Sequence, residues 1–131
     1  MREIKFRAWD KINKKMYKVE VLCPGKYIQI EKPENNKGNI LAPFEGRIWE
    51  DVEIMQYTGL LDKNEIEIYE GDILKTNISA KEFAEVIYDD TQTTYYAKYS
   101  DESTYPLTEW FKRNNEFEVI GNIYENKELL K

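Results

Sequence analysis

Alternation of apolar and polar residues is the strongest pattern in this chain, and it recurs from one end to the other. Near the N-terminus, Ile4, Phe6 and Ala8 alternate with charged residues. Strict alternation over four to eight residues is typical of a β-strand with one buried face. Further strands are therefore predicted around residues 17–21, 27–30, 52–57, 65–69, 83–88, 94–99 and 117–123.

The loops between these runs indicate how the strands are connected. Tyr17, Val19 and Val21 follow the first strand at hairpin distance, with residues 10–15 as the turn. Residues 31–39 are polar and either separate an N-terminal unit from the rest or form a long hairpin loop. We expect one domain over residues 1–131, which allows an N-terminal β unit (residues 1–30) before a main body (residues 40–131).

Helical signals are short. Residues 79–82 match a capping box, residues 107–111 have helical apolar spacing after a proline, and Asn126 is placed to cap a C-terminal turn. None of these extends beyond one or two turns. The predicted fold class is therefore mainly β: short antiparallel strands forming a small, partly open barrel or packed sheets, with one or two short helical turns.

Composition excludes several kinds of site. The 131 residues include no histidine and a single cysteine, Cys23. Histidine-based triads, histidine-ligated zinc, an internal disulfide and a four-cysteine metal site are thereby excluded. The chain shows no signal-peptide pattern and no apolar run long enough to span a membrane. We expect a soluble cytoplasmic protein that uses no cofactor.

Carboxylates are then the remaining candidates for catalysis. Acidic doublets occur at residues 50–51, 89–90 and 101–102. Neighbouring carboxylates on a strand point to opposite faces, and no stretch has the alternating pattern of a calcium loop. We interpret the doublets as solvated charges and predict no catalytic residue and no metal ligand.

The charge is distributed unevenly along the chain. Residues 1–30 contain eight Lys/Arg and three Asp/Glu, whereas residues 31–131 contain 11 and 22. The first segment can be a phosphate-binding edge, or a solvated hairpin tip that pairs with the acidic body or with another subunit. We favour the second interpretation, because the acidic remainder repels nucleic acid. The candidate nucleic-acid contacts are Arg7, Lys11, Lys14, Lys15, Lys18 and Arg47.

Tyrosines concentrate in one stretch and suggest a contact with another protein. Alternation places Tyr95, Ala97 and Tyr99 on one strand face and Tyr96 and Lys98 on the other. We expect one face to be core and the other to contact a protein, because tyrosine is frequent at interfaces. The predicted protein contacts are Tyr95, Tyr96, Tyr99 and Tyr105.

Six short motifs, taken in order, resemble the YopX family of phage and prophage proteins. They are IKFRAWD at 4–10, MY at 16–17, QYTGL at 56–60, DKN at 62–64, IYEGDI at 68–73 and VIGNIYEN at 119–126. The family often has glycine where this chain has Glu65 and proline where it has Lys127, and both departures affect turns. The resemblance implies a mainly β architecture, a phage or prophage source and the host cytoplasm. It supplies no catalytic residues.

These observations lead to two hypotheses of function. The first is a small phage protein without catalysis that binds another protein, copies of itself included. The alternative is a nucleic-acid-binding small barrel that uses the basic N-terminal hairpin.

Overall fold

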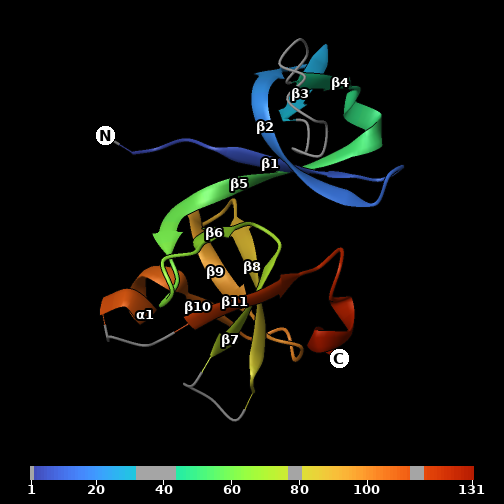
Figure 1. The fold of residues 1–131 in the computed structure, drawn as a ribbon. Coiled ribbons are helices and arrows are strands. Elements are labelled where there is room, and N and C mark those ends of the chain that lie inside the picture. The colour runs from blue at the N-terminus through green and yellow to red at the C-terminus, as the bar shows by residue number, and fades with distance from the viewer. Residues whose placement is uncertain (1, 32–43, 77–80, 113–116) are drawn as a thin grey trace. The chain divides into compact units, whose positions relative to one another are not determined.

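The computed structural model describes residues 2–31, 44–76, 81–112 and 117–131. Within these ranges the predicted fold class is confirmed (Figure 1). Two antiparallel sheets are present, neither closed into a barrel, together with one α-helix and two 3-10 turns. The predicted loop at residues 31–39 lies almost entirely outside the described residues.

The described chain forms two compact units, residues 3–56 and residues 57–131, each with its own hydrophobic core. Unit 1 contains strands in the order β4-β3-β2-β1-β5, and the second half of β5 continues into unit 2. Its elements are β1 (Phe6–Asp10), β2 (Lys15–Cys23), β3 (Tyr27–Glu31), β4 (Phe44–Arg47), the 3-10 turn η1 (Trp49–Asp51) and β5 (Val52–Leu61). Residues 3–30 of the predicted N-terminal β unit fall inside unit 1, but this unit extends to residue 56, so the predicted main body (residues 40–131) is divided between the two units.

The β1–β2 hairpin is confirmed, with Asp10 opposite Lys15, but two predicted core residues are exposed. Ile4 precedes β1 and is 63% exposed. Val21 is 40% exposed because a register shift between Val19 and Val21 moves Leu22 to the core side of β2. A one-residue slip exchanges the faces of a strand, and alternation alone does not reveal where it occurs.

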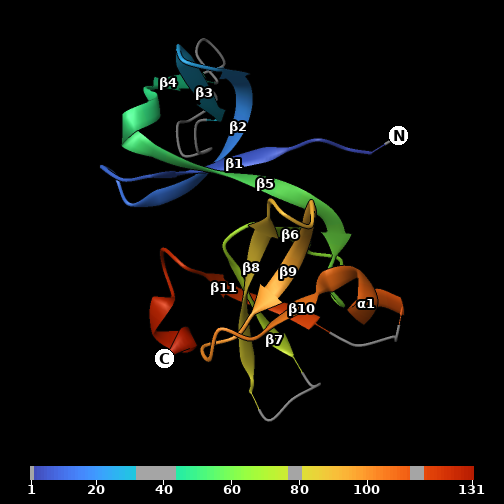
Figure 2. The same cartoon turned by 180° about the vertical axis from the view of Figure 1, so that it is seen from behind.

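Unit 2 is built on a five-stranded sheet with the order β10-β9-β8-β7-β11 (Figure 2). Ile68, Leu74, Val86, Leu107 and Phe117 form most of its core. Its elements are β6 (Glu67–Tyr69), β7 (Asp72–Thr76), β8 (Phe83–Asp89), β9 (Thr94–Lys98), β10 (Thr104–Pro106), α1 (Leu107–Lys112), β11 (Phe117–Asn122) and the 3-10 turn η2 (Lys127–Leu130).

A buried aspartate holds the first turn of unit 2. One carboxylate oxygen of Asp62 accepts hydrogen bonds from the backbone N–H groups of Asn64 (2.7 Å) and Ile66 (2.9 Å). The other accepts one from the N–H of Val119 on β11 (2.9 Å). Asp62 therefore forms the predicted turn and also ties it to a strand 57 residues away. In the strand predicted at residues 65–69, Ile66 belongs to this turn and is 51% exposed, whereas Ile68 is buried.

The other motif residues also form turns. Gly71 has a φ of +80°, which favours glycine, and Asp72 accepts a hydrogen bond from the N–H of Tyr69 (2.8 Å). Asn126 was expected to cap η2, but its side chain points back and accepts from the N–H of Asn122 (3.2 Å). Gly121 is required there, because a Cβ would lie 2.3 Å from the Asn126 Oδ1.

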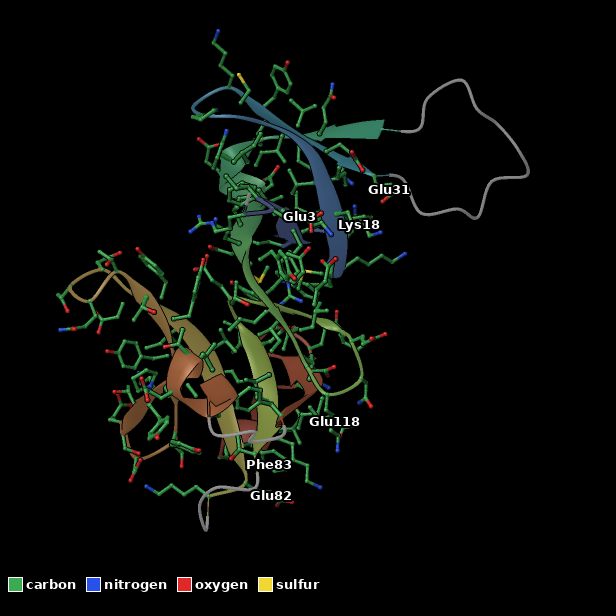
Figure 3. All side chains as sticks on the ribbon, turned by 90° about the vertical axis from the view of Figure 1, so that its left-hand side faces the viewer. Glu3, Lys18, Glu31, Glu82, Phe83 and Glu118 are labelled. Carbon is green, nitrogen blue, oxygen red and sulfur yellow. The ribbon has the colours of Figure 1, made fainter. Side chains whose placement is uncertain are left out.

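The helical turns predicted at residues 79–82 and 107–111 have different outcomes. The helix after Pro106 is confirmed as α1. Of the capping box at residues 79–82, Lys81 and Glu82 are not helical and lead directly into β8, whereas residues 79 and 80 lie outside the described ranges (Figure 3). Side-chain spacing alone does not decide between a helix cap and the entry to a strand.

We expect Asp62→Asn to lower the free energy of unfolding by about 2 kcal/mol, as measured by urea denaturation and circular dichroism. An amide has one acceptor oxygen, so its NH₂ group would oppose either the Val119 N–H or the turn N–H groups. Asp90→Asn, at an exposed position, is the matched control. Equal stability of the two variants would contradict this role for Asp62.

We expect Glu65→Gly to raise the free energy of unfolding by roughly 0.5 kcal/mol in the same assay. Glu65 has a φ of +63°, which costs a residue with a Cβ about 1 kcal/mol, and the entropy of an unfolded glycine offsets part of this gain. Glu65→Ala keeps the Cβ and is the control. A glycine variant less stable than the alanine variant would refute the explanation.

Candidate functional site

The hairpin end of β8 and β9 extends beyond its neighbours in the sheet (Figure 2). β7 pairs with β8 only over residues 83–85, and β10 pairs with β9 only over residues 96–98. The pairs Tyr88–Tyr95 and Asp89–Thr94 therefore have no flanking strand among the described elements. At this end Tyr88 is exposed, whereas Tyr95 is half-buried and packs against the core of unit 2.

Aromatic and apolar side chains occupy both faces of this ribbon end. On one face, Tyr88 and Tyr95 make an edge-to-face contact, with ring centroids 5.1 Å apart and planes at 63°. On the other, Ile87 lies opposite Tyr96, and both are half-buried. Tyr88 is 42% exposed. We call Ile87, Tyr88, Tyr95 and Tyr96 the aromatic end.

The pKa of the Tyr95 hydroxyl lies above the usual tyrosine value of 10.0. Burial raises the pKa of Tyr95, and the nearby negative charge of Glu70 raises it further, while Arg2 acts in the opposite direction. Tyr95 therefore presents a neutral ring and a hydroxyl that can donate a hydrogen bond at physiological pH.

The structure divides the four predicted contact tyrosines. The predicted alternation is confirmed, since Ala97 and Tyr99 are buried in the core. Tyr99 is 7% exposed and its hydroxyl lies 3.2 Å from that of Thr76, so it leaves the contact set. Tyr105 is half-buried against the same core. Tyr95 also packs against this core, but it does so at the aromatic end, where Tyr96 lies on the other face of the ribbon.

The turn at the end of this ribbon is acidic and rigidly bonded. One carboxylate oxygen of Asp89 accepts hydrogen bonds from the hydroxyl (2.6 Å) and N–H (2.8 Å) of Thr91 and from the N–H of Gln92 (3.2 Å). These bonds lower the pKa of Asp89, so it is ionised at neutral pH. Asp90 beside it is exposed.

Two of the six predicted nucleic-acid contacts are neutralised within unit 1. The Arg47 Nε donates to the buried Asp10 carboxylate (2.7 Å), and the guanidinium lies 5.8 Å from the ring centroid of Tyr17. Burial raises the pKa of Asp10, but hydrogen bonds from Arg47, Asn13 and Ile12 outweigh it and the pKa is lowered. Lys11 forms an ion pair with Glu53 (3.2 Å).

The remaining basic residues lie along the β1–β2 hairpin. Arg7 is half-buried opposite Lys18, which is labelled on β2 in Figure 3. Lys14, Lys15 and Lys18 are exposed, and none forms an ion pair with another described residue. By sequence, residues 3–56 carry ten Lys/Arg and nine Asp/Glu (10 − 9 = +1), whereas residues 57–131 carry eight and sixteen (8 − 16 = −8). The basic hairpin therefore belongs to a nearly neutral unit.

The acidic doublet at residues 101–102 serves in a turn and in ion pairs. Asp101 accepts from the N–H and the hydroxyl of Ser103 and pairs with Lys81, while Glu102 pairs with Lys98 (2.9 Å). Within the described ranges, no three cysteine or carboxylate side chains form a group that could hold a metal ion. No helix there has the length and apolar character needed to cross a membrane.

Sequence reasoning missed two exposed apolar residues. Ile12, 68% exposed, is the apolar residue within the basic turn of the β1–β2 hairpin. Tyr88 was assigned to a strand but not to a contact surface. Pairing the two strands through the 89–94 turn would have placed it opposite Tyr95 and revealed the aromatic end.

The face of the β8–β9 ribbon that holds Ile87 and Tyr96 also carries the half-buried carboxyl group of Glu85. Glu85 lies opposite Lys98, and burial raises its pKa, although the positive charges of Lys98 and Lys127 act to lower it. The folded chain thus binds the Glu85 proton more tightly than the unfolded chain. The contribution of Glu85 to stability therefore falls as pH rises from about 4.5 through the raised pKa.

We expect Glu85→Gln to have a higher Tm than the unchanged protein at pH 7, because glutamine resembles the protonated form. The difference should shrink at about pH 4, where both side chains are neutral. Exposed Glu82→Gln is the control in both thermal scans. A Tm difference that does not depend on pH would contradict the assignment.

Comparison with known proteins identifies the fold and family of this chain, but it assigns no catalytic or binding residue. The crystal structure of protein EF1440 from Enterococcus faecalis is similar over 100% of both chains, with 30% sequence identity and a TM-score of 0.64. No curated protein is significantly similar. The family model described as YopX protein matches residues 5–131, nearly the whole chain. The resemblance seen in the motifs is thereby confirmed, and the chain belongs to the YopX family.

Proposed function

We propose that this chain is a phage- or prophage-encoded protein that acts in the cytoplasm of the bacterial host by binding other protein chains, without catalysis. Its source and location are inferred from membership of the YopX family. The contact surface is the aromatic end of the β8–β9 hairpin.

The observation that carries this proposal is the aromatic end itself. Tyr88 and Tyr95 pack edge to face where β8 and β9 lack flanking strands, and Ile87 and Tyr96 lie on the other face, beside the end of β10. Tyrosine provides a large contact area, loses little conformational entropy on binding and keeps a polar hydroxyl. Such side chains carry much of the binding energy at protein interfaces.

The acidic groups support a role without catalysis. General acid–base chemistry needs two groups held at a common reacting atom. Asp89 and Asp101 instead bond to the turns that contain them, and Glu102 and Glu53 pair with lysines. Carboxylates used in this way shape loops and keep the protein charged.

The alternative is nucleic-acid binding through Arg7, Lys11, Lys14, Lys15, Lys18 and Arg47. Arg47 and Lys11 are already paired with carboxylates, and the adjoining unit carries a charge of −8 by sequence. We therefore expect no change in the fluorescence anisotropy of labelled DNA or RNA at about 0.05 M salt. Binding that weakens with salt, and with Lys14→Gln and Lys15→Gln, would favour the alternative instead.

The protein-binding proposal is tested by replacing Tyr88 with the photo-crosslinking residue p-benzoylphenylalanine in living host cells. We expect irradiation to give discrete protein adducts, because this position lies within the proposed contact surface. Mass spectrometry identifies each adduct, and the purified partner is then bound to the unchanged protein and to Tyr88→Ser.

Tyr27 is the matched control position, since it is 45% exposed and lies in unit 1. We expect no discrete adduct there, and a loss of affinity of about tenfold or more for Tyr88→Ser. The proposal is refuted if position 88 gives no adduct, or gives only those found at position 27.

A further inference from the structure

We propose that the aromatic end binds a second copy of this chain, and that it does so at the basic tip of the β1–β2 hairpin. The proposal rests on the protein-binding function and names the partner. The contact joins unit 2 of one copy to unit 1 of another.

The basic tip is a rigid surface with an apolar centre. One oxygen of the buried Asp10 carboxylate accepts from the N–H groups of Ile12 (2.9 Å) and Asn13 (3.0 Å). The other accepts from the Asn13 side chain (3.0 Å) and Arg47 (2.7 Å). These four bonds fix the turn, with Ile12 68% exposed and Lys14 beside it.

The aromatic end, which is the proposed partner of the basic tip, adjoins a turn of opposite charge that is also fixed by an aspartate. The bonds to Asp89 fix the turn between β8 and β9, and Asp90 is exposed next to it. Tyr88, 42% exposed, provides the apolar centre. Because both turns are fixed by internal bonds, little conformational entropy is lost when they meet.

Charge and apolar area have separate roles in this contact. An exposed ion pair contributes only about 0.2–1 kcal/mol, so Lys14, Lys15 and Asp90 mainly select and orient the partner. Burial of Ile12 against tyrosine rings provides affinity that salt does not screen. Both surfaces occur on every copy, so a second copy supplies the complementary partner without any further component.

The experiment exchanges charges between the two surfaces. One variant carries Ile12→Glu and Lys14→Glu, and the other carries Asp90→Lys and Gln92→Lys, all at exposed positions. Sedimentation equilibrium is measured at about 0.05 M and about 0.5 M NaCl. We expect the unchanged protein to self-associate at low salt and to associate more weakly, but still measurably, at high salt.

Each variant alone should associate at least about tenfold more weakly, since its two surfaces then lose their charge complementarity and, in the first variant, the apolar centre of the tip. An equimolar mixture should regain association, because the intact hairpin tip of one variant meets the intact aromatic end of the other. This recovery also shows that both variants are folded. Val21→Glu with Lys26→Glu, likewise an exposed apolar residue and an exposed lysine, is the matched control and should associate normally.

The proposal is overturned if the unchanged protein stays monomeric at low salt, or if mixing the variants restores nothing. Its failure differs from failure of the protein-binding function. A monomeric protein whose position 88 still crosslinks to another protein would end the self-contact and leave the function standing. Absence of any adduct at position 88 would end both.

Discussion

The carboxylate of Asp62 is the interaction on which unit 2 most depends. Its three backbone hydrogen bonds form the turn after β5 and join it to β11, with a further bond from the Lys63 N–H to the Phe117 carbonyl (3.0 Å). The short strands here leave many backbone groups at their ends, and a buried aspartate satisfies several of these at once. In unit 1, the buried Asp10 carboxylate likewise accepts backbone hydrogen bonds from its own turn. Each unit therefore has a buried aspartate that holds a turn next to its core.

The residues of the family motifs therefore have structural roles in turns and packing. Asp62, Gly71, Asp72, Gly121 and Asn126 all belong to the motifs that carry the YopX resemblance, and each has a turn or close-packing role. The turns that they form tolerate few other residue types. Function is then sought in side chains outside the motifs, such as Tyr88, Tyr95 and Ile12.

Much of the fold was predictable from the sequence, because period-2 alternation and turn residues are local signals. The predictions failed where one residue changed the register, at Val21, and where a side chain found another backbone partner, as Asn126 accepts a hydrogen bond from the N–H of Asn122. The candidate site was predictable only in part. Alternation gave the faces of Tyr95 and Tyr96, but the exposure of Tyr88 depends on where β7 and β10 end.

β5 gives the two units a shared element of folding. Its first half pairs with β1 through Gln56, and its second half pairs with β6 from Tyr57 onward. When either unit folds, half of this strand is already extended, and the other unit loses less backbone entropy in pairing with the remainder. When one unit unfolds, the other unit keeps its half of β5 paired, and the remaining half of this strand becomes unpaired. Separate hydrophobic cores are thus coupled in stability through one continuous backbone.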